Sequence, residues 1–132
     1  MKPAHLTATI VKADDRQIAW GWASVSTVDG ALYEDLQGHT IAPSEMESMA
    51  DSFMLSVRTA KAMHEGGQIG EVVHSFPLTK ALGEALGITS TYEGWVIAMK
   101  IHDADVWQRV KAGELQAFSI GGVGKLEEYD AQ

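Results

Sequence analysis

Cysteine is absent from this 132-residue chain, and several other features are scarce. Without cysteine there can be no disulfide, no zinc site built on thiolates and no cysteine nucleophile, and the composition fits a reducing compartment. Apolar runs are only a few residues long, so we expect no membrane partner. The segment Met1-Lys2-Pro3-Ala4-His5 has neither an apolar stretch nor a cleavage site, so no secretory signal is expected.

Positive charge is scarce as well. Ten Lys and Arg residues stand against 18 Asp and Glu, which gives a net charge of -8. No basic patch stands out, and nucleic acid is therefore not expected as a partner. Apolar residues make up 45% of the chain, enough for the core of a single domain over residues 1–132.

Alternating apolar residues predict strands, and apolar residues at helical spacing predict helices between them. The expected strands cover residues 6–11, 17–25, 69–76, 92–101 and 115–123, and the expected helices cover 44–57, 79–86 and 103–110. We expect a polar loop over 26–40 and Pro77 as a strand end. Ser44 should cap the first helix in a box with Glu47, Gly87 should end the second helix, and Asp103 should cap the third. The fold class is α+β, a small, mostly antiparallel β-barrel or curled sheet with two to three peripheral helices.

The end of the chain carries the clearest chemical signal. Ser119 lies between Phe118 and Ile120 in an expected strand, so it should point to the face opposite theirs. Gly121 and Gly122 follow, and glycines let a substrate carbonyl approach the backbone closely. This is a plausible setting for a nucleophilic serine, which needs an adjacent base.

Histidine is the usual base, and the chain has five: His5, His39, His64, His74 and His102. His64 follows an expected helix and precedes Gly66-Gly67, which favours a place at the rim of a cleft. A solvated or hydrogen-bonded role remains open for each histidine. No HxH or HExxH spacing accompanies them, so neither a metal nor another cofactor is expected.

Other conspicuous residues have simpler interpretations. The four tryptophans are expected to anchor the core, because an acidic protein has little use for a base-stacking platform. Met46, Met49 and Met54 are expected to pack in the core. The stretch Gly121-Gly122-Val123-Gly124 near Lys125 lacks the spacing of a phosphate loop and is discounted.

Five segments in order resemble the phage prohead (head maturation) serine proteases, in particular the XkdF-like group. They are residues 19–24, 35–41, 63–64 with 69–73, 94–101, and 106–114 with 117–122. The resemblance implies a fold similar to the herpesvirus assemblin-type proteases and a serine endopeptidase that cleaves scaffold and capsid proteins. Ser119 would then be the nucleophile and His64 the general base, with the backbone of Gly121 and Gly122 as a source of oxyanion donors.

The third catalytic residue has more than one candidate. Related proteases would carry it on a strand beyond the serine, but 13 residues follow Ser119 here. Either the chain is truncated at its C-terminus or the residue lies inside it, and His74 and Glu71 are the internal candidates. Their spacing of three residues puts them on opposite faces of a regular strand, so at most one can face His64 without a bulge.

The resemblance also implies partners and a place of action. The substrates would be phage scaffold and major capsid proteins, inside the immature procapsid in the host cytoplasm, and a homodimer is an option. Two other functions remain open: a catalytically inactive capsid-assembly module with the protease fold, and a small-molecule or metal-binding barrel.

Overall fold

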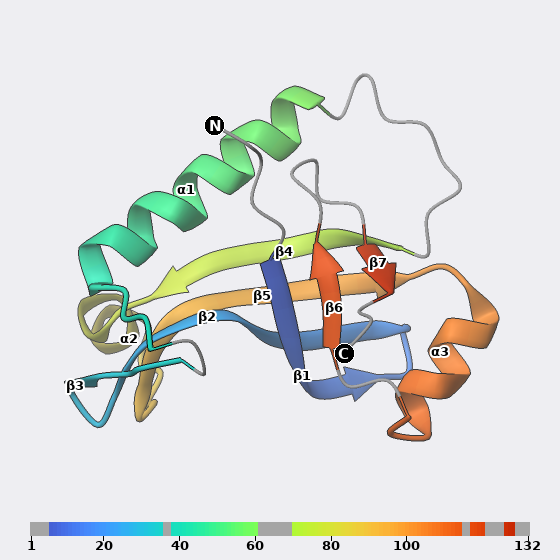
Figure 1. Cartoon of the computed structure of the whole chain (residues 1–132), viewed down its shortest axis with the longest axis horizontal. Coiled ribbons are helices and arrows are strands. Elements are labelled where there is room, and N and C mark those ends of the chain that lie inside the picture. The colour runs from blue at the N-terminus through green and yellow to red at the C-terminus, as the bar shows by residue number, and fades with distance from the viewer. Residues whose placement is uncertain (1–5, 36–37, 61–69, 115–116, 121–125, 129–132) are drawn as a thin grey trace.

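One antiparallel sheet forms the centre of the computed structural model, which describes residues 6–35, 38–60, 70–114, 117–120 and 126–128. Within these residues seven strands join in the order β4-β5-β2-β1-β6-β7, and β3 pairs with β2 beside that path (Figure 1). The strands are β1 (Leu6–Asp14), β2 (Ile18–Val28), β3 (Ala31–Leu32), β4 (Gly70–Leu78), β5 (Tyr92–Ile101), β6 (Ala117–Ile120) and β7 (Leu126–Glu128).

Three helices accompany the sheet in the described residues: α1 (Pro43–Ala60), α2 (Lys80–Leu86) and α3 (Ala104–Lys111). The side chain of Thr79 accepts a hydrogen bond from the Leu82 amide and caps α2, and Gly87 ends that helix in the left-handed conformation, as predicted. Asp103 caps α3 in the same way through the Val106 amide. The cap predicted for α1 is wrong by two positions, because Pro43 is the first residue of the helix, Ala42 precedes it and Ser44 lies inside.

One face of the sheet, here called the inner face, carries the hydrophobic core. Alternate residues of β5 supply its centre, and α1 and α3 cover it (Figure 1). The buried side chains of this core are Ala19, Met46, Ala50, Phe53, Trp95, Ile97, Met99, Ile101, Val106, Trp107 and Val110. The alternation arises because successive strand residues point to opposite faces, so the other residues of β5 belong to the outer face.

The sheet curls until its two edges approach each other. In Figure 1, β1, β6 and β7 cross in front of β2, β5 and β4, and β7 lies close to β4. A Cβ atom on Gly21 would lie 1.9 Å from the carbonyl oxygen of Thr9, so glycine is what lets β1 come so near to β2. No ladder joins β4 to β7 in the described residues, so the predicted curled sheet is present and a closed barrel is not.

The sequence prediction also missed features of the strands. β3 lies within the predicted polar loop, and β7 was not expected. Pro77 does not end β4 but pairs with Trp95 inside it. This is tolerated because β4 is an edge strand of the sheet, where one side of the backbone needs no ladder partner.

Candidate functional site

Ser119 lies in β6, the strand in which the sequence placed it. Its backbone pairs with Thr7 of β1 on one side and with Glu127 of β7 on the other. The backbone at position 119 is thus fixed by a ladder on each side. Thr7 and Thr9 are two residues apart on β1 and therefore share one face of the sheet. Thr9 pairs with Trp22 of β2, and Ser119 pairs with Thr7, so position 119 belongs to the outer face.

His64, Gly121 and Gly122 lie outside the described residues, so the pairing of Ser119 with His64 stays a prediction. The two candidates for the third position, His74 and Glu71, both lie in β4 and are described. The site is therefore built from β6, whose register is known, and from the outer face of β4, β5 and β2.

A bulge in β4 changes the relation between Glu71 and His74. The register shifts between Val72 and His74, so Glu71 pairs with Lys100 and His74 with Ala98. Lys100 and Ala98 are two residues apart on β5 and share its outer face, so their partners share it too. A regular strand would hold Glu71 and His74 on opposite faces, but β4 has a bulge here, and the extra residue brings both to the same side.

His74 stacks on Trp20 across the small side chain of Ala98. The ring centroids are 5.4 Å apart and the planes differ by 10°. Ala98 pairs with Trp20 on one side and with His74 on the other, and it is fully buried under the two rings. In the described part of the chain, no hydrogen-bond partner meets the ring nitrogens of His74. The stack thus orients the ring by its face and leaves its edge, which carries both nitrogens, available.

Glu71, in contrast to His74, has a hydrogen-bond partner among the described residues. Its carboxylate lies 2.9 Å from Nε2 of His102, and both side chains are about half exposed. His102 is therefore an ion-pair partner of Glu71 when protonated. The contact removes some of the freedom that Glu71 would need to orient a catalytic histidine.

The tryptophans fall into two pairs. Trp95 and Trp107 are buried in the core, as predicted. Trp20 and Trp22 are only partly buried and lie on the outer face, so the prediction of four core anchors is wrong for these two. Their spacing of two, with Gly21 between them, is the signal that could have placed them together on one strand face.

A groove crosses the outer face at these tryptophans. It has a volume of about 420 Å³ and runs over β1, β2 and β5, with walls that include Val11, Lys12, Trp20, Trp22 and Val96. The sequence did not predict it, because Val11 reaches the groove through a second bulge, between Ile10 and Lys12 of β1.

The turn at one end of the groove is held by an ion pair. Arg16 Nη2 lies 3.1 Å from the carboxylate of Asp14, and the Arg16 amide donates to the same carboxylate. Loss of solvent acts to raise the pKa of Asp14, but the hydrogen bonds and charge of Arg16 outweigh it and hold that pKa below its ordinary value. Asp14 is thus an anion at neutral pH.

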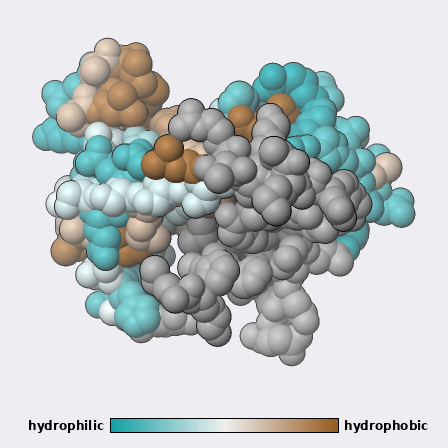
Figure 2. Space-filling view, turned by 90° about the horizontal axis from the view of Figure 1, so that it is seen from above, coloured by the Kyte–Doolittle hydropathy of each residue, from teal (hydrophilic) through white to brown (hydrophobic). Residues whose placement is uncertain are grey.

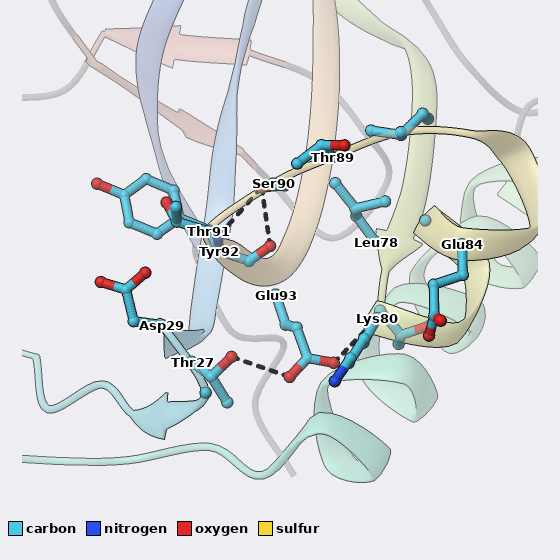
Figure 3. Close-up of a pocket in the computed structure, with 14 residues that line it drawn as sticks. Thr27, Asp29, Leu78, Lys80, Glu84, Thr89, Ser90, Thr91, Tyr92 and Glu93 are labelled. Atoms are coloured by element: carbon cyan, nitrogen blue, oxygen red, sulfur yellow. Dashed lines mark hydrogen bonds between the residues drawn. The ribbon is translucent and has the colours of Figure 1, made fainter.

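A second cavity, of about 440 Å³, lies at the far end of β2 and β5, beside α2 (Figure 3). Glu93 is at its base and accepts hydrogen bonds from the Thr27 hydroxyl (2.9 Å) and the Lys80 amide (2.8 Å). Those contacts use the carboxylate to tie β2, β5 and α2 together. The cavity therefore has a structural explanation that needs no ligand.

Other classes of site receive no support from the described residues. Within them no group of His, Asp and Glu side chains is arranged to hold a metal ion. Among the described helices, none is both long and apolar enough to span a membrane. Of the helix methionines, Met46 is buried, Met49 is partly buried and Met54 is exposed, so the predicted core role fails for Met54. Figure 2 shows the described apolar residues of one face as separate groups among polar ones.

Comparison with known proteins places this geometry in context. No solved structure matches the chain, so the expected likeness to assemblin-type proteases has no support from a known fold. The uncharacterized protein YqbD of Bacillus subtilis (strain 168) is 31% identical over 106 residues, which cover 76% of this chain. The chain spans about a third of that relative, since the matched residues are 32% of its length.

A family match covers nearly the whole chain. The family is described as "Putative phage serine protease XkdF", and it matches residues 7–128. This range includes all seven strands except the first residue of β1, together with Ser119, His64, His74 and Glu71. The chain therefore belongs to the phage serine protease family XkdF.

Proposed function

We propose that this chain is a serine endopeptidase domain that cleaves phage scaffold and major capsid proteins during head maturation. It would act inside the immature procapsid, in the cytoplasm of the host. The observation that carries the proposal is the family match over residues 7–128, because that range contains both a candidate nucleophile and a candidate base. The backbone at Ser119, laddered on both sides, adds a rigid support of the kind that catalytic groups need.

In this proposal Ser119 attacks the carbonyl carbon of the scissile peptide bond. His64 takes the hydroxyl proton as the C–O bond forms, and the carbonyl oxygen becomes an oxyanion. Backbone N–H groups of Gly121 and Gly122 would donate to that oxyanion. His64 then gives its proton to the leaving amine, the C–N bond breaks, and water releases the acyl group from Ser119 by the same steps.

We assign the third catalytic position to His74 in preference to Glu71. The Trp20 stack holds the His74 ring by its face and leaves its nitrogens without a partner in the described residues. Glu71 already binds His102 at 2.9 Å. A ring nitrogen of His74 can therefore accept a hydrogen bond from His64 and orient it, as the third member of a triad does.

The proposal is tested by co-expressing the chain with its cognate scaffold and capsid proteins and analysing the products by mass spectrometry. Wild type is expected to produce discrete cleavages, and Ser119→Ala and His64→Ala to abolish them. Ser52→Ala, at an exposed position of α1, and His39→Ala, in an exposed loop, are the matched controls and should cleave like wild type.

Two outcomes would contradict the proposal. Cleavage that persists in Ser119→Ala would remove Ser119 as the nucleophile. Normal assembly with uncut scaffold in wild type would favour the inactive capsid-assembly module instead.

A further inference from the structure

The groove on the outer face has walls suited to an apolar side chain. Val11 is 62% exposed there, and the half-buried rings of Trp20 and Trp22 lie beside it with Val96. Exposed apolar surface gathered in a concavity is typical of a binding site, and about 420 Å³ lies within the range of such sites. The groove is thus large enough for one bulky side chain and the backbone beside it.

Charge at the groove is unbalanced. Two cations line it, and Arg16 is held by Asp14 at 3.1 Å. Lys12 is exposed, and no carboxylate in the described residues lies within 4.0 Å of its ammonium group. In a chain with a net charge of -8, a lysine without a carboxylate partner among the described residues makes the groove locally favourable for an acidic group.

Strand β1 links the groove to the strand of Ser119, because it pairs with β2 on one side and with β6 on the other. Ser119 pairs with Thr7, Thr9 lies two residues further along β1, and Thr9 pairs with Trp22 of β2. Two strand spacings and two residue rises give a path of about 12 Å, measured along the surface of the curled sheet. An extended peptide covers about 12 Å with about four residues, so a chain cut at Ser119 reaches the groove a few residues from the scissile bond.

We propose that this groove is a specificity subsite for an extended polypeptide substrate that carries a large apolar residue next to an acidic one. The apolar side chain lies against Trp20 and Trp22, and the acidic side chain pairs with Lys12. The pair lies about four residues from the bond that is cut. This inference rests on the proposed peptidase function and adds the class of sequence that the site selects.

The test uses the full chain with Ser119→Ala, so that binding is measured without turnover. The probes are two ten-residue Ser/Gly peptides, one with a central Phe-Asp pair and one with Phe-Lys. Binding is followed through the indole N–H signals of the tryptophans in nitrogen-15 NMR spectra. Trp95 serves as an internal reference, because its indole donates to Ser75 in the interior at 2.7 Å.

We expect the Phe-Asp peptide to shift the Trp20 and Trp22 signals and to leave Trp95 unchanged. The Phe-Lys peptide should bind about five-fold more weakly, and Lys12→Glu should reverse that preference. Lys111→Glu makes the same charge change on α3 and should keep the wild-type preference. Shifts confined to other tryptophans, or a preference that Lys12→Glu leaves intact, would overturn the inference.

A parallel digestion of the cognate scaffold and capsid proteins with the wild-type chain separates this inference from the proposed function. Binding at Trp20 and Trp22 in Ser119→Ala with no cleavage by wild type would contradict the peptidase function and leave the groove as a peptide-binding site. Cleavage by wild type without those shifts would contradict the subsite and leave the peptidase function standing.

Discussion

Both faces of the sheet carry tryptophans, but the surroundings of these side chains differ between the faces. On the inner face Trp95 is 1% exposed, contacts Phe53 edge to face and donates its indole N–H to Ser75. On the outer face Trp20 and Trp22 keep part of their rings in water, and Trp20 holds a histidine instead of core side chains. The inner face therefore supplies stability, and the outer face presents aromatic and titratable groups that the core does not need.

Removing one tryptophan from each face should give the largest difference in stability between the two faces. Trp95→Ala should lower the free energy of unfolding by about 4 kcal/mol, because it empties a large site in the core. Trp22→Ala should cost about 1–2 kcal/mol, since its ring is only partly buried and loses mainly the edge contact with Tyr92. Urea unfolding measures both, and equal losses would contradict the distinction between the faces.

The next largest loss of stability is expected at Gly21, where β1 lies close to β2. Gly21→Ala should cost about 3 kcal/mol, because its new methyl group would collide with the Thr9 carbonyl oxygen. Gly30→Ala is the matched control: it has a positive φ of 83° but open space around it, so only backbone strain of about 1 kcal/mol is expected. Similar losses in the two variants would mean that β1 does not approach β2 as closely as described.

The outer face should matter for activity more than for stability. His74→Ala should lower kcat about 100-fold and leave the unfolding free energy within about 1 kcal/mol of wild type. His74→Phe keeps an aromatic ring over Trp20 but removes both nitrogens, so it should lose as much activity as His74→Ala.

Glu71→Gln is the matched control for His74 on the same strand face. It weakens a half-exposed contact with His102, so stability should change by no more than about 1 kcal/mol and kcat should stay close to wild type. Steady-state kinetics on a cleaved scaffold peptide measures all three variants. An active His74→Phe, or a Glu71→Gln as impaired as His74→Ala, would exclude His74 as the third residue.

The smallest effect concerns the ion pair at the end of the groove. The pKa of Asp14 is lowered in the folded chain, so its stabilising effect is complete above the ordinary aspartate pKa of about 3.9. It is lost as the pH falls through the lower pKa of the folded state. Asp14→Asn should therefore reduce the thermal midpoint slightly at pH 7 and not at all at the acid end of a pH series. A difference in thermal midpoint between wild type and Asp14→Asn that grows toward low pH would contradict a stabilising ion pair between Asp14 and Arg16.

Local patterns in the sequence predicted most of the fold. The alternation in β2 and β5, the caps of α2 and α3 and the order of the main elements follow from neighbouring residues. Pro77 in β4 and the bulge at Val73 did not, because they depend on where β4 sits in the sheet and how it pairs with β5.

The site was predictable only in part for the same reason. The strand of Ser119 could be derived from Phe118, Ile120 and the glycines that follow. The common face of Glu71 and His74, the stack on Trp20 and the groove beside Lys12 all arise from bulges and cross-strand registers. Such registers join residues far apart in sequence, so no local pattern encodes them.

The central claim, that Ser119 is an activated nucleophile, is tested most directly by covalent labelling with a fluorophosphonate and peptide mass spectrometry. We expect one labelled serine in the wild-type chain, Ser119, and loss of that label in His64→Ala. A chain that remains unlabelled, or a label on another serine, would contradict it.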